Sequence, residues 1–244
     1  MATPSHTLPG APSTRLPILL LYGGVLLIGV LLGLLPWLEH GWNDTAAQLF
    51  ARYTARFSVL LFLLVFVARP VATLWRNPLT RGLLMRRRHL GLAFALAHAI
   101  HFVALVSFLR FQGSGFEAGD APALAAYGMI VLMAATSSNT AVRRLGRWWK
   151  RLHRAGIWYV FLIFLAAYGG RVVEGPVEAV AGAVPPGSYG AHVVVTIALL
   201  GGVLLRVPPA TGPGRKPRRA IADPETRHGG SPWSIASSVS SPST

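Results

Sequence analysis

The sequence has no cysteine and very few acidic residues. The absence of cysteine excludes disulfide bonds, cysteine-ligated iron–sulfur clusters and covalently attached c-type haem. Any metal must therefore be held by histidine, methionine, carboxylate or backbone groups. Only 13% of the 244 residues are charged, 52% are hydrophobic, and the mean hydropathy is positive. This balance predicts an integral membrane protein rather than a soluble domain.

Long apolar runs predict an all-α bundle of six transmembrane helices. We place these helices at about residues 16–38, 45–68, 88–110, 122–138, 148–170 and 190–206. The first run is uncharged, too long for a signal-peptide core and followed by no small-residue cleavage site, so we expect it to remain as a helix. In the second run the stretch 57–68 is too short to cross alone. An N-cap at Asp44 or Thr45 would supply the missing turns, and Arg69-Pro70 would end the helix.

Basic residues are concentrated in alternate loops. The loops after the second and fourth helices contain Arg69, Arg76, Arg81, Arg86, Arg87 and Arg88, and Arg143, Arg144, Arg147, Lys150 and Arg151. The other loops contain six of the eight acids, namely Glu39, Asp44, Glu117, Asp120, Glu174 and Glu178. Because loops rich in Lys and Arg stay in the cytoplasm, we expect a cytoplasmic-membrane protein with both termini inside. The net charge of +15 then faces the anionic headgroups of the lipid bilayer, and nucleic acid is not the expected partner.

The two ends of the chain differ in composition from the segment 16–206. Residues 1–15 are rich in proline, serine and threonine, and residues 207–244 are rich in proline, serine, glycine and arginine. Both ends are predicted to be disordered. The sequence RKPRR at 215–219 suits a headgroup anchor, and docking of an acidic cytoplasmic partner is the alternative.

Two histidines lie in the middle of the third predicted helix. Counted from Arg88 at the basic edge, His98 and His101 are ten and thirteen residues into the helix, or about 15 and 20 Å deep. Their spacing of three places both on roughly one helix face. Ionisable side chains at this depth mark functional sites by default, and neutral imidazole is a common ligand of haem iron. The alternative is a pair of interhelical hydrogen bonds to backbone carbonyls or hydroxyl groups.

The remaining histidines have weaker positions. His153 lies in a basic segment with Trp148 and Trp149, which is typical of a membrane interface, and His89 lies among arginines at the inner edge of the third helix. Interface placement alone accounts for His192, and solvent exposure accounts for the histidines in loops or predicted disordered ends, which are His6, His40 and His228. On position alone, His89 is a reserve ligand candidate.

Two segments of this sequence resemble the ferric reductase-like transmembrane domain superfamily, which includes NADPH oxidases, ferric reductases and the haem-binding membrane subunit of the methionine sulfoxide reductase system. The resemblance covers about residues 16–206. The residues that carry it are Arg87, Arg88, Leu90, Gly91, Leu92 and His101, and then Thr136, Ser137, Leu145, Gly146, Trp149, Leu152, His153 and Arg154. The end of the second helix at Arg69-Pro70 and the six-helix layout also match.

The resemblance implies haem b held by histidines of the third and fifth helices, with His101 and His153 at the matching positions. Two ligand positions depart from the family pattern, because Ala166 and Arg87 stand where further histidines are usual. His98 is one turn from His101 and is a substitute, whereas a His89–His153 pair at the inner edge is a second arrangement. Both stay open, as does loss of haem.

The resulting expectation is a membrane electron-transfer subunit, and a membrane oxidoreductase component only with a separate partner. No glycine-rich dinucleotide fingerprint is present, so no FAD or NAD domain is expected in the chain. Electrons would come from a separate flavoprotein reductase or from quinone, and would pass to an unknown outer acceptor. Arg52 and Arg56, four residues apart, are candidate partners of haem propionates. The rival expectation is a non-redox scaffold or small carrier that keeps the fold without haem.

Overall fold

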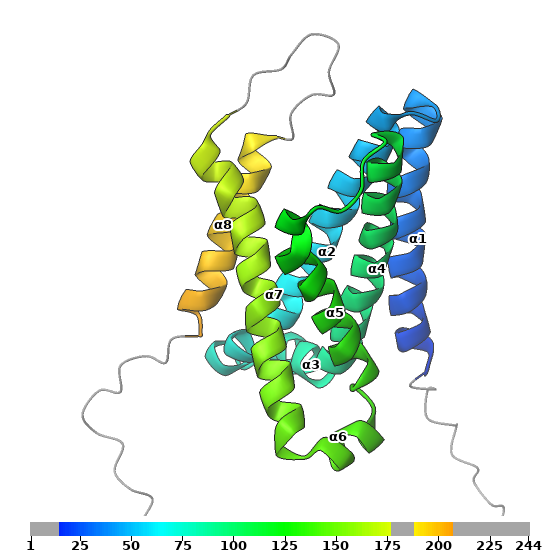
Figure 1. Ribbon diagram of the computed structural model, residues 1–244. Helices are drawn as coiled ribbons and strands as arrows, with labels where there is room; N and C mark the ends of the chain where they lie inside the picture. The colour runs from blue at the N-terminus through cyan, green and yellow to red at the C-terminus, as the bar shows by residue number, and fades with distance from the viewer. Residues whose placement is uncertain (1–14, 177–187, 207–244) are drawn as a thin grey trace, which may run out of the picture. The chain divides into compact units, whose positions relative to one another are not determined.

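A computed structural model describes residues 15–176 and 188–206 of the chain, and the described part is helical throughout apart from its short connections. The predicted disordered segments at residues 1–15 and 207–244 lie outside the described residues, apart from Arg15. The elements are α1 Arg15–His40, α2 Asp44–Leu74, α3 Pro78–Met85, α4 Arg87–Phe111, the 3₁₀ turn η1 Ala118–Asp120, α5 Ala121–Ala135, α6 Asn139–Leu145, α7 Arg147–Glu174 and α8 Tyr189–Leu204 (Figure 1).

Five of these helices are long and apolar enough to cross a bilayer. The five candidate spans are Leu16–His40, Asp44–Leu74, Arg87–Phe111, Ala118–Ala135 and Arg147–Glu174. The sixth predicted span corresponds to α8, which has 16 residues and a length of about 24 Å. That length is shorter than the hydrocarbon core of about 30 Å. The all-helical membrane architecture is therefore confirmed, whereas a sixth crossing rests on a helix that needs snorkelling end groups or local bilayer thinning.

The first turn of α2 is fixed by a different residue from the one expected. The side chain of Asn43, rather than of Asp44 or Thr45, accepts a hydrogen bond from the Ala46 N–H at 2.9 Å. An Asn at this position binds one of the backbone donors that a helix start leaves free. Asp44 is instead the first helical residue, where its charge favours the positive end of the helix.

Helix α2 continues through Pro70 to Leu74, so the prediction that Arg69-Pro70 ends it is wrong. Proline has no N–H, so the carbonyl four residues earlier, that of Phe66, loses its helical donor. The guanidinium of Arg206 supplies donors instead, because its Nη2 and Nε lie 2.7 and 3.3 Å from the Phe66 oxygen. The helix can therefore accommodate Pro70 because a side chain that follows α8 binds the freed carbonyl.

The two basic loops contain short helices, α3 and α6, that were not predicted from the sequence. Asn77 closes a capping box with Thr80 at the start of α3, and Ser138 caps α6. Gly146 ends α6 with a φ of +50°, a conformation that favours glycine, so α7 begins as a separate helix. In Figure 1 α3 and α6 lie at the same end of the bundle. Arg88 Nη1 joins the two loops by a 2.8 Å hydrogen bond to Asn139 Oδ1.

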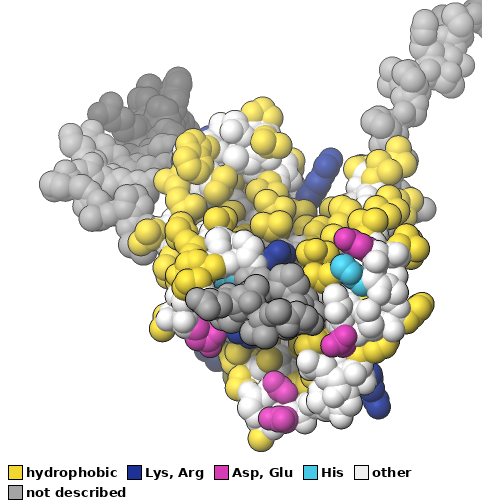
Figure 2. Space-filling view, turned by 90° about the horizontal axis from the view of Figure 1, so that it is seen from above, with side chains coloured by type: hydrophobic (Ala, Val, Ile, Leu, Met, Phe, Trp, Pro, Cys, Tyr) yellow, Lys and Arg dark blue, Asp and Glu magenta, His cyan; other side chains and the backbone are white. Residues whose placement is uncertain are grey.

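The opposite end of the bundle carries the acidic side chains. Seen from above in Figure 2, Asp and Glu side chains are spread over this face, and Lys and Arg side chains show near its middle and at its rim. The charge division predicted from the loops is thus present in space, although it does not by itself assign a side of the membrane.

Helix α2 is the central element of the helical core. It packs along α4 over its length and also contacts α1 and α8, while α7 packs against α5 and α8. Aromatic side chains fill the interior, with Phe62 and Phe66 of α2 almost fully buried. Gly202 of α8 lies so close to Phe66 that an added Cβ would meet its ring at 3.2 Å. Large apolar side chains of α1 point outwards, as expected for a lipid-facing helix.

Candidate functional site

His98 and His101 lie side by side between α4 and α2. Their ring centroids are 5.4 Å apart, and His98 is only 7% exposed. Each ring faces a hydroxyl of α2: His98 Nδ1 lies 3.2 Å from Ser58 Oγ, and His101 Nδ1 lies 3.2 Å from Thr54 Oγ1. The two hydroxyls are four residues apart on α2 and the two histidines are three apart on α4, so each pair spans about one helical turn on one helix face. The structure therefore brings the two predicted mid-membrane histidines together.

The hydroxyl contacts favour one position of the imidazole proton. Ser58 Oγ donates its only proton to the Ala55 carbonyl at 2.9 Å, and Thr54 Oγ1 donates to the Phe50 carbonyl at 2.7 Å. A hydroxyl has one proton, so both oxygens act as acceptors towards the histidines. Nδ1 of each ring is then the donor, and Nε2 keeps its lone pair. This is the arrangement of a metal-ligating histidine, whose second nitrogen binds a fixed partner.

Aromatic side chains cover the two imidazoles. Tyr127 of α5 stacks on His98 with centroids 4.4 Å apart and reaches His101 at 6.3 Å. Phe94 and Phe164 contact His98 at 5.5 and 5.6 Å. These rings shield the imidazoles from water, which favours neutral imidazoles and a low-dielectric site.

His153 lies in a different part of the bundle from His98 and His101. Its Nε2 and Nδ1 lie 3.2 Å from the carbonyl oxygens of Met133 and Trp149, and its ring stacks on Trp149 at 4.1 Å. Phe164 touches His98, and His153 is eleven residues earlier on α7, which corresponds to about 16 Å along the helix. The structure therefore does not bring His153 to the level of the mid-membrane pair.

His89 faces α1. Its Nδ1 lies 3.1 Å from the Tyr22 hydroxyl, and the two rings meet edge to face at 6.2 Å. Within the described ranges no contact joins His89 to His153, so the second arrangement considered from the sequence is not assembled here. His192 contacts the Ser188 carbonyl at 3.1 Å, as suits a residue at a helix start.

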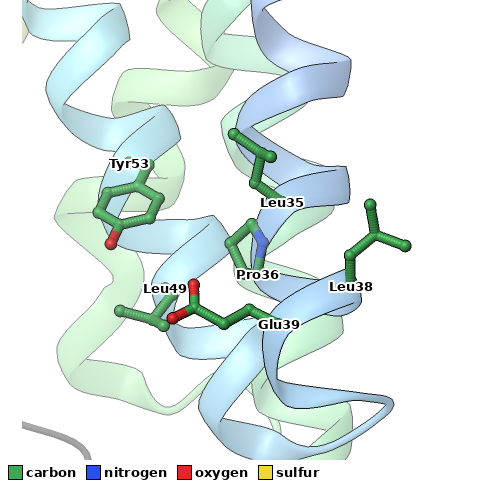
Figure 3. Close-up of a pocket in the computed structure, with 6 residues that line it drawn as sticks. All are labelled: Leu35, Pro36, Leu38, Glu39, Leu49 and Tyr53. Carbon is green, nitrogen blue, oxygen red and sulfur yellow. The ribbon is translucent and has the colours of Figure 1, made fainter.

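The described part of the chain contains no group of three or more His, Cys, Asp or Glu side chains placed to hold a metal ion. Two open grooves among the described residues are lined by no histidine. One groove, of about 430 Å³, lies between α1 and α2 near the acidic end and is lined by Leu35, Pro36, Leu38, Glu39, Leu49 and Tyr53 (Figure 3). The other, of about 400 Å³, lies along α4 and is lined by Phe102, Val103, Val106, Ser107, Arg110 and Phe111.

Several residues that contact the two histidines were not predicted from the sequence. Thr54 and Ser58 carried a signal, because two hydroxyls spaced by four in an apolar run share one helix face. Tyr127 carried none, since nothing in the α5 sequence relates it to α4. Arg52 and Arg56, the candidate propionate partners, are half-buried on the same turns of α2 as Thr54 and Ser58.

The helices and the buried imidazole pair define an integral, multi-pass helical membrane protein. The chain is similar to a protein named the heme-binding subunit MsrQ of protein-methionine-sulfoxide reductase from Bordetella pertussis, with 28% identity over 162 residues that cover 61% of this chain and 75% of that protein. The proteins of the same name from Bordetella parapertussis and Bordetella bronchiseptica match with the same identity and coverage. No protein-family model and no solved structure matches the chain.

Proposed function

We propose that this protein is a haem-binding subunit that carries electrons through the cytoplasmic membrane. The observation that supports the proposal most is the pair of buried imidazoles, each with Nδ1 at 3.2 Å from a hydroxyl oxygen of α2. The similarity to proteins named as haem-binding subunits supports it independently. Bound haem b would supply one-electron exchange between ferric and ferrous iron.

His98 and His101 are the residues that would hold the haem iron. His98 and His101 both offer Nε2, and Ser58 and Thr54 hold the rings in the required tautomer. His98 and His101 lie on one helix face, so either of them would hold the haem from the α4 side. Because His153 is about 16 Å away along α7, we propose that it does not share an iron with His98 or His101. His153 and His89 are retained as ligand candidates at the basic end.

The polar groups around the pair have further roles in this proposal. Arg52 and Arg56 are the cations of α2 nearest in sequence to Thr54 and Ser58, and they would bind the carboxylates of the haem edge. Phe94, Phe164 and Tyr127 exclude water, so that the electron is passed without access of protons or solvent.

The electron donor and acceptor lie outside the chain in this proposal. With the basic loops in the cytoplasm, a separate flavoprotein reductase or membrane quinone would reduce the haem, and an outer acceptor would take the electron. The relatives are named as subunits of a reductase, which supports the expectation of a partner protein. The chain would thus be an oxidoreductase component rather than a complete enzyme.

A haem-free scaffold is the second candidate. It is favoured by the close stacking of Tyr127 on His98, which takes up space beside the ligand atoms, and by the hydroxyl partners that already satisfy both Nδ1 groups. In this case the imidazoles serve as interhelical hydrogen-bond donors. The two candidates differ in one measurable property, the presence of haem.

Spectroscopy of the purified protein tests the proposal. Protein expressed in haem-replete cells and purified in mild detergent should show a Soret band that shifts on reduction with dithionite. His98→Ala and His101→Ala should reduce or remove this band, whereas His192→Ala, a histidine near the start of α8, should leave it unchanged. His153→Ala and His89→Ala then show whether the basic end contributes a ligand. A colourless wild-type preparation after haem supplementation would refute the redox proposal in favour of the scaffold.

A further inference from the structure

Three arginines from three separate segments meet near Pro70 of α2. Arg206 follows α8 and binds the Phe66 carbonyl through Nη2 and Nε at 2.7 and 3.3 Å. Arg87, the first residue of α4, binds the preceding carbonyl, that of Val65, through Nε at 3.2 Å. Arg69 lies one turn further along α2, and both Arg69 and Arg87 are close enough to act electrostatically on the Arg206 guanidinium. Like charges are therefore gathered at one point of the helix bundle.

The hydrogen bonds to backbone carbonyls hold the guanidiniums of Arg87 and Arg206 in place but use only some of their N–H donors. A guanidinium has five N–H groups, and Arg87 uses only Nε, while Arg206 leaves Nη1 without an acceptor in the described residues. Arg206 also lies flat on Phe66, with its central carbon 3.7 Å from the ring centroid, and 5.4 Å from the Trp158 ring. Arg69 makes no side-chain hydrogen bond within the described ranges and is exposed. The guanidiniums of Arg87 and Arg206 are thus held by backbone carbonyls, and that of Arg69 has no hydrogen-bond partner among the described residues.

The backbone at this point adds to the positive potential. Helix α4 begins at Arg87 without a side-chain cap, so the positive end of its dipole lies at the cluster. No carboxylate balances these charges in residues 15–176 and 188–206, because the five acids of those ranges, Glu39, Asp44, Glu117, Asp120 and Glu174, belong to the loops of the opposite end. An anion bound here would offset the charge of the three arginines and of the helix start. Guanidinium groups match the geometry of phosphate oxygens, so a phosphate group suits this position.

We propose that Arg69, Arg87 and Arg206 form a binding site for the phosphate group of an anionic phospholipid at the basic end of the bundle. Basic recesses between membrane helices on the cytoplasmic side bind such headgroups, and the acyl chains of the lipid would lie against the apolar surfaces of α2 and α8. The site joins α2, α4 and the end of α8, so an occupied site stabilises the packing of these helices around Pro70. The proposal is independent of haem, and its test needs no haem.

A competition assay tests the site on the full-length protein in zwitterionic detergent. A fluorescent acyl-labelled phosphatidylglycerol is bound to the protein and then displaced by unlabelled phosphatidylglycerol, phosphatidylcholine or inorganic phosphate. We expect displacement by phosphatidylglycerol and none by phosphatidylcholine. Displacement by millimolar inorganic phosphate at equal effectiveness would overturn the lipid assignment, because a free phosphate would then be the occupant.

Arginine variants distinguish lipid binding at a specific site from general attraction of the lipid to the basic surface. Arg69→Gln should weaken phosphatidylglycerol binding about fivefold, and Arg87→Gln by a similar factor. The controls Arg81→Gln and Arg144→Gln remove the same charge from exposed positions of α3 and α6 and should leave the affinity unchanged. Equal weakening by all four variants would overturn the proposal. Arg69→Gln is decisive if other variants fold poorly, because Arg69 makes no side-chain bond to the described bundle.

The acids of the C-terminal segment are the remaining competitor for the three arginines. Asp223 and Glu225 lie outside the described residues. If a carboxylate from this segment were the occupant, the double variant Asp223→Asn, Glu225→Gln would bind the labelled lipid more tightly, by about fivefold or more. That result would overturn the lipid assignment, whereas unchanged binding in this variant supports it.

Discussion

At the scale of single residues, His98 and His101 depend on hydroxyls whose own protons are already committed. Ser58 and Thr54 donate to carbonyls of their own helix, so their oxygens can only accept from the imidazoles. The two α2 side chains therefore select one tautomer for each histidine without contributing any charge. A carboxylate in the same place would instead stabilise protonated imidazole and remove the free lone pair.

Removal of the Ser58 hydroxyl should destabilise the protein. Ser58→Ala leaves the buried Nδ1–H of His98 without an acceptor, and we expect a loss of about 1–3 kcal/mol in the free energy of unfolding. Unfolding in mixed micelles of increasing SDS content measures the change. Ser107→Ala is the matched control, because its hydroxyl contacts only the Val103 carbonyl of α4. An equal effect of the two variants would show that the hydroxyl does not hold the imidazole.

The same hydroxyl should affect haem if haem is bound. Loss of a hydrogen bond to the non-ligating nitrogen of a metal-bound histidine typically weakens metal binding about 10- to 100-fold. We expect Thr54→Val and Ser58→Ala to lose haem faster than wild-type protein when apomyoglobin is added as a haem acceptor. The change of myoglobin absorbance with time reports the rate. Identical rates in wild type and both variants would indicate that neither His98 nor His101 binds iron.

At the scale of helices, the turn of α2 before Pro70 connects distant parts of the sequence. Pro70 leaves the Phe66 carbonyl without a backbone donor, and Arg206 binds it from beyond α8. The adjacent carbonyl of Val65 is bound by Arg87 at the start of α4. Arg87 and Arg206 therefore connect the start of α4 and the end of α8 to one turn of α2.

A double-mutant cycle tests this account of the Pro70 turn. Arg206→Gln alone should cost about 1–3 kcal/mol, because the Phe66 carbonyl loses a charged donor in an apolar setting. Pro70→Ala restores a backbone N–H that can bind the same carbonyl, so in this background the cost of Arg206→Gln should fall to about half or less. Both costs are measured by unfolding in mixed micelles. Additive effects of the two substitutions would show that Arg206 does not replace the missing backbone donor.

At the scale of the whole molecule, the absence of cysteine makes the membrane topology directly measurable. We predict that Ser114→Cys, between α4 and α5, reacts with a membrane-impermeant maleimide in intact cells. Thr140→Cys in α6 should react only after permeabilisation, since the basic loops are expected in the cytoplasm. Thr211→Cys, beyond α8, should behave like Thr140→Cys if α8 crosses the membrane. Labelling of Thr211→Cys from outside would limit the protein to five spans.

Periodicity and charge were sufficient to predict the helices because both are local properties of the sequence. The apolar runs gave every long helix within a few residues, except where Pro70 was taken as an end. That error is physical: Arg206 lies 140 residues from Phe66, and no local pattern relates the two. The short α3 and α6 were missed because their caps at Asn77 and Ser138 lie in loops read only for charge.

Less of the candidate site than of the fold could be predicted from the sequence. His98 and His101 were predicted as site residues because they lie in the middle of a transmembrane helix, and the structure brings them together. The same reasoning could not exclude a link to His153, since the level of a residue on α7 relative to α4 depends on tertiary packing. The contacts with Tyr127 and Phe164 likewise arise from packing alone.

The dependence of the Phe66 carbonyl on Arg206 has a consequence for biosynthesis. A ribosome finishes α2 long before it reaches residue 206, so this carbonyl enters the lipid phase without its eventual donor. Until Arg206 is synthesised, water, a lipid headgroup or another protein has to solvate that oxygen. A chain that stops short of residue 206 therefore lacks the donor for this carbonyl, even though α2 is already complete.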